Sequence, residues 1–427
     1  MQLKKTKPNL KVLLTTASCA LLGGTAQAQS DEGWQFDTAI MHYAEADRVT
    51  ATEAIIAGQK SFANDQVLNL KLTIDALTGA SPNGAVAQQT PQTFTRPSGN
   101  GQYTVKPGDT PLDDTFKDTR VQLTGQWTQP LWQNYTVSAG GNFSKEYDYM
   151  SASVNGNIAR DFNKKNTTLS MGIAYAYDII EPEGGIPKPF TSMVIGDSDD
   201  PSFDDEFDNT RKGGDDSKST VDLLFGITQV INRQMIVQFN YSYSSVSGYL
   251  TDPFKVLSLV NENGEAQEYL YEHRPDERTK HAFFGQSKYH FDNGILDASY
   301  RFMTDDWKID SHTIDVRYLI PFENGHFIEP HVRFYTQSAA EFYQPFLEQA
   351  NALPEYASAD YRIGELDTYT VGVKYGMPMG SANNLAFKLE YYHQTPKSNG
   401  TEEIGVLKGV ELYEEVDAII AQVTYSF

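Results

Sequence analysis

The sequence is poor in cysteine, in long apolar runs and in basic charge. Its single cysteine, Cys19, excludes a disulfide framework and any thiolate-bound zinc or iron–sulfur site. No run of about 18 apolar residues follows the N-terminal region, which excludes a helical membrane protein. The 34 lysines and arginines are outnumbered by 56 aspartates and glutamates, and the net charge of −22 argues against nucleic-acid binding. Aromatic residues are plentiful, at 12% of the 427 residues, and their placement has to be explained.

The N-terminal segment has the pattern of a secretory signal peptide. Four lysines precede an apolar stretch at 12–22, and the Ala-Gln-Ala at 26–28 has the small-x-small form of a signal-peptidase site. We expect cleavage after Ala28, so that residues 1–28 are removed and residues 29–427 form the exported domain. A lipoprotein with Cys19 as the lipidated residue is the alternative, but the apolar stretch before Cys19 is short.

Most of the chain alternates between apolar and polar residues. In 67–76, for example, Leu68, Leu70, Leu72 and Ile74 alternate with polar residues, so that one face of an extended strand is apolar and the other is polar. Each alternating segment has about ten residues, the length that a tilted strand needs to cross a bilayer. The same pattern recurs at 34–43, 49–59, 121–127, 135–143, 169–177 and 235–243.

The connections between these segments alternate between short and long. Short turns are expected at 130–134, 163–166, 231–234, 292–294, 323–326 and 380–384, and long polar connections at 79–117, 179–217, 247–279, 339–364 and 396–411. An outer-membrane barrel sorts its connections in this way, because its periplasmic turns are short and its extracellular loops are long. The pattern therefore predicts an all-β fold, an antiparallel transmembrane barrel in the outer membrane of a Gram-negative cell.

The strand count follows from the C-terminus. Thirteen strands are counted from Val121 onward and three before it, which gives about sixteen. Fourteen is the alternative if 49–59 is not a strand, since Glu53 and Ile55 would share a face. The last segment alternates up to Phe427, and such an aromatic terminus resembles the signal that the barrel assembly machinery recognises. Tryptophans and tyrosines near the strand ends, such as Trp132 and Tyr177, fit the two interfacial aromatic belts.

Several blocks of sequence resemble an uncharacterised family of proteobacterial outer-membrane proteins, domain-of-unknown-function family 3570. The blocks lie at 45–49, 74–85, 92–95, 251–256 and 271–275, and the last two read Thr-Asp-Pro-Phe-Lys-Val and Tyr-Glu-His-Arg-Pro. The resemblance spans essentially the whole mature chain. It implies an outer-membrane barrel, and it supplies no known activity, ligand or catalytic residue.

With the apolar face outward, charged side chains point into the lumen, mainly in the second half of the chain. The inward set comprises Lys71, Asp75, Asp222, Lys288, His290, Asp297, Arg301, Asp315, Arg317, Glu329, His331, Arg333, Lys374, Lys388 and Glu390. Six of these fall on three consecutive strands and are the pore-lining candidates: Arg301, Asp315, Arg317, Glu329, His331 and Arg333. Side chains on neighbouring strands are close enough to form a charged ladder. One interpretation is a network that keeps the lumen polar and rigid; the other is a constriction that selects ions or anionic solutes.

One predicted outer loop is strongly acidic. Its carboxylates include the metal candidates Asp197, Asp199, Asp204, Asp205 and Asp208. Carboxylate oxygens suit a hard cation such as calcium, but Ser202 stands where a helix–loop–helix calcium site needs glycine. We therefore interpret it as a solvated acidic loop and predict no metal site; a dedicated cation site is one alternative, and divalent ions that bridge the loop to lipopolysaccharide phosphates are another.

These observations predict a non-enzymatic channel for small solutes, without a cofactor, in contact with outer-membrane lipid and lipopolysaccharide. The first alternative is a barrel plugged by its own loops 79–117 and 248–278, which anchors a periplasmic partner protein. The second is an outer-membrane lipid hydrolase, suggested by His393 followed by Ser398-Asn399-Gly400. A hydrolase needs the histidine within hydrogen-bond reach of the serine, and Pro396 between them disfavours this arrangement.

Overall fold

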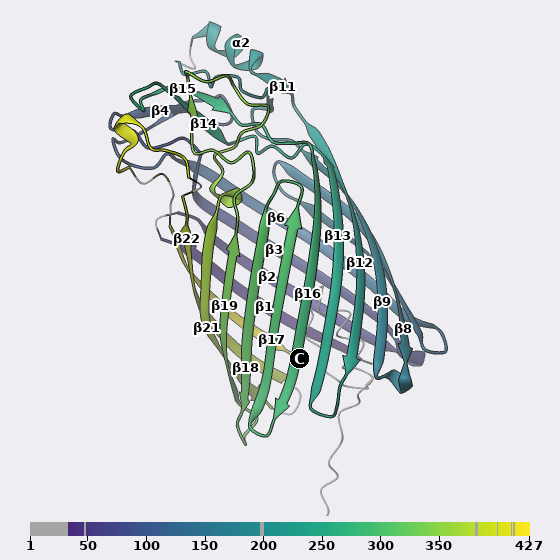
Figure 1. The fold of residues 1–427 in the computed structure, drawn as a ribbon. Helices are drawn as coiled ribbons and strands as arrows, with labels where there is room; N and C mark the ends of the chain where they lie inside the picture. Colours follow the sequence, from purple (N-terminus) through teal and green to yellow (C-terminus); the bar gives the residue numbers. More distant parts are fainter. Residues whose placement is uncertain are drawn as a thin grey trace, which may run out of the picture.

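A computed structural model describes residues 33–427 except 47, 197–199, 381–382, 399, 411 and 413–414. Sixteen antiparallel strands close into a barrel (Figure 1), which confirms the predicted fold. In barrel order they are β1 (Trp34–Glu45), β2 (Thr50–Phe62), β3 (Gln66–Pro82), β6 (Leu112–Trp132), β7 (Tyr135–Lys145), β8 (Tyr149–Phe162), β9 (Thr167–Ile180), β12 (Asp216–Val230), β13 (Met235–Gly248), β16 (Glu277–Phe291), β17 (Gly294–Asp305), β18 (Asp310–Pro321), β19 (Phe327–Gln337), β21 (Leu366–Met379), β22 (Asn383–Pro396) and β23 (Val416–Ser426).

The segment that left the strand count open is a full strand, β2, so the alternative of fourteen strands is wrong. Its alternation is imperfect because Glu53 and Ile55 share the lumen face. The charge of Glu53, which is partly exposed, is offset by an arginine two strands away in the lumen wall. Arg120 on β6 lies 3.9 Å from Glu53 and 2.7 Å from Asp75 on the intervening β3. The predicted signal peptide lies outside the described residues.

The barrel closes between its first and last strands. β1 pairs with β23 from Asp37 opposite Ser426 to Glu45 opposite Ala418. Beyond this register, the backbone N–H of each of Phe36 and Phe427 donates to the carbonyl of the other, over 2.8 and 2.9 Å. Phe427 therefore completes the seam.

The outer surface of the barrel is apolar. Large side chains such as Ile40, Val154 and Phe239 are 59–63% exposed, whereas their neighbours along each strand point into the lumen. Trp132 ends β6 beside a periplasmic turn and Tyr177 lies near the extracellular end of β9, as expected for the two belts. Such a surface matches the apolar band that transmembrane barrels present to lipid.

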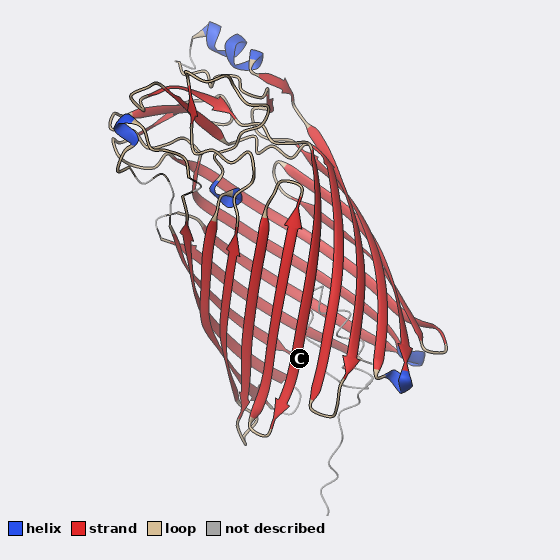
Figure 2. Cartoon of the chain, viewed as in Figure 1, coloured by secondary structure: helices blue, strands red, loops and turns tan. Residues whose placement is uncertain are grey.

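The connections are sorted as predicted. At the periplasmic side they are short turns, two of which carry the short helices η2 (Ala63–Asp65) and η3 (Asn163–Lys165). At the extracellular side five long loops carry further elements: β4 (Gln92–Thr95), β5 (Gln102–Val105), β10 (Ile186–Pro187), α2 (Pro201–Asn209), β11 (Arg211–Gly213), β14 (Val256–Val260), β15 (Ala266–Tyr271), β20 (Leu347–Glu348), η4 (Tyr361–Ile363) and η5 (Gly405–Leu407). Figure 2 shows these elements gathered at one end of the barrel.

None of the helices in the described part of the chain is long and apolar enough to span a membrane.

The long loops fold together into an extracellular cap with its own hydrophobic core. Strand β14 pairs with β15 of the same loop and, in parallel, with β20 of another loop. Most of the fully buried apolar side chains of the molecule lie here rather than in the barrel. Four clusters make up this core: Ala85, Phe94, Val256 and Tyr271; Val86, Val260, Phe346 and Leu407; Leu257, Leu270, Leu347 and Ala357; and Trp307, Ile309, Ala340, Phe342, Tyr343 and Ile363.

A buried ion-pair network joins two loops of the cap. Arg274 lies 2.6 Å from Glu272, which is fully buried, and 2.8 Å from Asp360 of the loop after β19. Arg362 contacts the same Asp360 and also Asp252. Loss of one partner would leave a buried charge unpaired, which is strongly destabilising. The network therefore fixes the two loops relative to each other.

Phe94→Ala tests whether the cap is a folded unit. Phe94 is fully buried and packs against Tyr103 and Tyr269, with ring centroids 5.4 and 4.5 Å away. We expect its loss to destabilise the cap by about 3–5 kcal/mol and to speed trypsin cleavage of the loops, while the barrel stays folded. Leu353→Ala, at a half-exposed position of another loop, is the control and should leave cleavage unchanged. Equal cleavage of both variants would contradict a cooperative cap.

Candidate functional site

Two stretches of the lumen wall differ in their inward side chains. From β7 to β13 the inward side chains are mainly hydroxyl and amide groups, among them Ser138, Asn142, Ser153, Asn155, Asn157 and Ser242. From β16 to β22 charged side chains dominate. There the strand register places one row side by side: Lys288, Asp297, Arg317, His331, Gly372 and Glu390. The charges expected in the second half of the chain thus lie on one wall.

His331 on β19 is the centre of this charged wall. Its Nε2 lies 2.9 Å from Asp315 Oδ2 on β18, and its Nδ1 lies 2.8 Å from Glu390 Oε1 on β22. A neutral imidazole donates from only one nitrogen, so both contacts are hydrogen bonds when the ring carries two protons. Arg317 donates to Asp315 over 3.3 Å, and Lys388 donates to Glu390 over 3.1 Å. A continuous hydrogen-bonded chain therefore crosses four strands.

The contact between His331 and Glu390 depends on a glycine. The two residues lie on strands that are separated by β21, so their backbones are roughly 10 Å apart. Gly372 lies directly between them in the register. A Cβ at this position would overlap Glu390 Cγ and lie 2.8 Å from the Leu389 carbonyl oxygen. Without a side chain at Gly372, Glu390 can lean across β21 and reach the imidazole.

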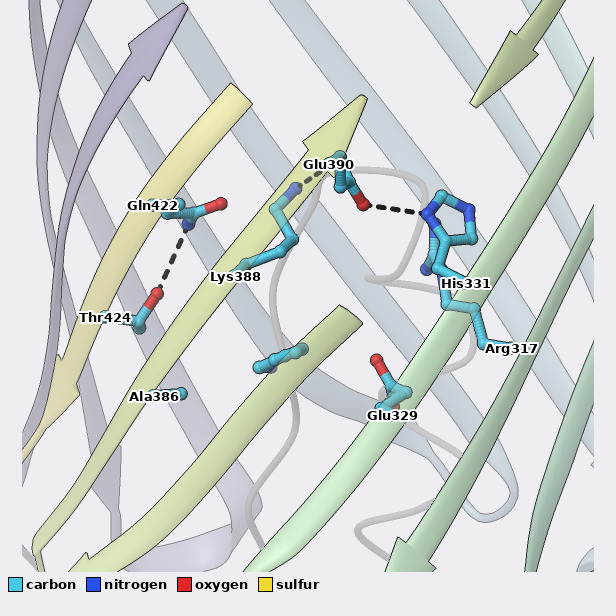
Figure 3. Close-up of a pocket in the computed structure, with 9 residues that line it drawn as sticks. Arg317, Glu329, His331, Ala386, Lys388, Glu390, Gln422 and Thr424 are labelled. Carbon is cyan, nitrogen blue, oxygen red and sulfur yellow. Dashed lines mark hydrogen bonds and ion pairs between the residues drawn. The ribbon is translucent and has the colours of Figure 1, made fainter. Parts of the chain in front are cut away.

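The charged wall surrounds a cavity of about 190 Å³ (Figure 3), lined by Arg317, Glu329, His331, Lys374, Ala386, Lys388, Glu390, Gln422 and Thr424. The anions of the chain are covered, with the side chain of Glu390 8% and that of Asp315 19% exposed. The cations are more open, with Lys388 30% and Arg317 46% exposed. Because the cations of this hydrogen-bonded group are exposed and its carboxylates are covered, the group presents mainly positive charge to the cavity.

The structure brings together four of the six pore-lining candidates: Asp315, Arg317, Glu329 and His331. Arg333 faces Asp315 in the register and Arg301 faces Thr313, and neither lines the cavity among the described residues. Three further residues of the site, Lys374, Lys388 and Glu390, were in the inward set but not among the candidates. The six candidates lie on three consecutive strands, which leaves out β21 and β22. In the sequence, the signal for including β22 is a glycine, Gly372, at an inward position between two strands with charged inward residues.

The acidic loop does not form one compact group in the described residues. Asp197 and Asp199 lie outside them. Asp204, Asp205 and Asp208 are exposed on α2, whose other face buries Phe203 and Phe207. The interpretation as a solvated acidic loop stays a prediction, and a cation site remains the alternative to it.

A different carboxylate trio lies at the extracellular end of β6 to β8. Carboxylate oxygens of Asp118, Glu146 and Asp148 are within 4.8 Å of one another, a set of ligands that a hard cation would accept. Arg120 lies 3.9 Å from Glu146 and already offsets part of the charge. Burial, together with a hydrogen bond to Asp118, raises the pKa of Glu146 to about 7. At lower pH the trio therefore holds a proton.

His393 has partners other than those expected for a hydrolase. Its Nδ1 lies 2.8 Å from Asp417 Oδ1 and its Nε2 lies 3.0 Å from Thr395 Oγ1. The hydroxyl of Ser398 instead accepts from the backbone N–H of Gly400 over 3.3 Å. Within the described structure, the serine that the sequence suggested is not paired with this histidine.

The closed antiparallel sheet, its apolar outer belt and its charged lumen define a transmembrane β-barrel of the outer membrane. The chain belongs to the family described as Protein of unknown function (DUF3570), whose model matches residues 11–427. The resemblance inferred from the sequence blocks is thus confirmed. No curated protein matches the sequence.

Solved structures with a similar architecture are outer-membrane barrels of low sequence identity. A bacterial polysaccharide outer-membrane secretin has a TM-score of 0.44 at 7% identity, covering 93% of this chain and 100% of that one. The ferric enterobactin receptor PfeA has a TM-score of 0.44 at 6% identity, and the match covers 86% of this chain and 55% of the receptor. The outer membrane protein opdK from Pseudomonas aeruginosa has a TM-score of 0.37 at 9% identity, covering 93% and 99%.

Gly372→Ala is expected to break the His331–Glu390 contact. The added methyl group overlaps Glu390, so the free energy of unfolding in detergent micelles should fall by about 1–3 kcal/mol. Gly125→Ala is the matched control, because a Cβ there would meet Leu70 Cδ2 at an ordinary 3.5 Å. Equal denaturant midpoints for the two variants would show that the wall tolerates a side chain at Gly372.

The carboxylate trio predicts a pH-dependent stability. The folded pKa of Glu146, about 7, is above its unfolded value, so its proton-linked stabilisation is present at low pH and is lost as the pH rises through 7. We expect the denaturant midpoint to fall between about pH 5 and pH 8, and Glu146→Gln to remove part of that fall. Glu262→Gln, at an exposed loop position, should behave like the unmodified protein. An unchanged pH profile in Glu146→Gln would contradict the assignment.

Proposed function

We propose that this protein is an outer-membrane channel for small solutes, with a preference for anions at a constriction formed by the charged wall. The observation that carries the proposal is the exposure of its charges. The cations Arg317 and Lys388 face the cavity, whereas the carboxylates Glu390 and Asp315 are covered by His331 and by these cations. A permeating ion therefore meets positive charge first.

The stretch of wall from β7 to β13 supports the same function. Its hydroxyl and amide groups offer both donors and acceptors to a passing solute and its water. A barrel of sixteen strands is also wide enough to leave an aqueous lumen unless loops fill it. A mainly uncharged stretch of wall and a charged wall with exposed cations would orient an anionic solute as it passes.

Reversal potentials in planar bilayers under a salt gradient test this proposal. In the double variant Arg317→Gln/Lys388→Gln, the carboxylates of the wall lose their counter-charges, so we expect a shift toward cation selectivity. Glu329→Gln removes a negative charge from the same cavity and should shift the potential in the opposite direction.

Lys71→Gln is the matched control, since Lys71 also faces the lumen but lies on β3, away from the cavity. Its reversal potential should equal that of the unmodified protein. Identical potentials in the double variant and in Lys71→Gln would show that the charged wall does not set the selectivity.

A second candidate is a barrel that is closed by its own loops and serves to dock a periplasmic partner protein. It is favoured by the folded cap and by η4, whose Tyr361 lies near the lumen-facing Tyr43 and Tyr392. A folded barrel that gives no conductance steps, and that gains them when loop 338–365 is shortened, would support this candidate over the open channel.

A further inference from the structure

The lipid-facing surface of the barrel contains an apolar groove near its periplasmic end. The groove has a volume of about 350 Å³ and runs over β7, β8, β9 and β12. Its lining side chains include Ile158, Leu169, Met171 and Phe225, all of which are exposed on the outer face. A hollow of this size offers a hydrocarbon chain more contact than a flat surface does.

A single cation lies at the periplasmic end of this groove. The guanidinium of Arg160, two residues before the end of β8, lies 5.0 Å from the ring centroid of Tyr135 and 4.6 Å from that of Phe162. Among the described residues no carboxylate pairs with it. The adjacent Asp161 points to the lumen, where it accepts from Thr168 and pairs with Lys165.

The two features together specify a ligand. An unpaired arginine held between aromatic rings at the membrane interface attracts a phosphate group, which it can bind through two parallel hydrogen bonds. The groove that leads from it toward the bilayer centre takes an acyl chain. We propose that Arg160 and the groove form a binding site for one anionic phospholipid of the periplasmic leaflet. This site is separate from the lumen and does not depend on the channel function.

The molecule contains a natural comparison for this site. Lys60 lies two residues before the end of β2, with its ammonium group 5.7 Å from the Trp34 ring and 5.0 Å from the Phe62 ring. Its surroundings match those of Arg160, with a cation between two aromatic rings beside a periplasmic turn. Lys60 does not line the groove. If an anionic lipid were held only by a cation at the membrane interface, Lys60 and Arg160 would bind it equally well. If the groove is required, only Arg160 would bind it.

Native mass spectrometry of the purified barrel with equal amounts of phosphatidylglycerol and phosphatidylethanolamine tests the proposal. The unmodified protein should retain one phosphatidylglycerol. Arg160→Gln should reduce this retention about fivefold, and Lys60→Gln should leave it unchanged. Leu169→Trp, which fills the groove and keeps the arginine, should also reduce retention.

Equal retention by Arg160→Gln and the unmodified protein would overturn the proposal, as would an equal loss in Lys60→Gln. The same spectra report the number of chains. A dimer of the unmodified protein that Arg160→Gln and Leu169→Trp convert to monomers would identify the groove as a contact between two copies and would also overturn it. Circular dichroism of each variant confirms that the barrel is folded.

Discussion

The whole structure depends on the closure of one sheet on itself. In hydrocarbon each unpaired backbone N–H or C=O costs several kcal/mol, so a sheet with free edges cannot span a membrane. Pairing of β1 with β23, completed by the mutual hydrogen bonds of Phe36 and Phe427, removes both edges. Once the sheet is closed, alternate residues must face either lipid or lumen. Every other feature of the barrel follows from this division.

Different forces stabilise the barrel and the cap. The barrel depends on backbone hydrogen bonds, and its large apolar side chains face outward. The cap depends on burial of apolar side chains such as Phe94 and Val256 and on the ion pairs of Arg274, as in a water-soluble domain. The molecule is therefore a membrane scaffold that carries a small folded unit at its extracellular end.

The lumen site shows how much one residue without a side chain can decide. Neighbouring strands bring charges within reach in pairs, but the chain from Arg317 to Lys388 needs a contact across an intervening strand. Gly372 permits that contact, because a side chain there would occupy the space that Glu390 fills. On the outer face, Arg160 of β8 and Tyr135 of β7 likewise come together between strands, at one end of the groove.

The sequence by itself determined the barrel, because alternation with period two, loop lengths and an aromatic last strand are local properties that a lipid environment imposes directly. It also determined which charges face inward, including Lys374, Lys388 and Glu390. Only the tertiary structure decided which of them meet, since the register across β21 and the absence of a side chain at Gly372 are relations between distant segments. The cap likewise required the fold, because its core joins residues such as Val86 and Leu407 that lie far apart in the chain and carry no common pattern.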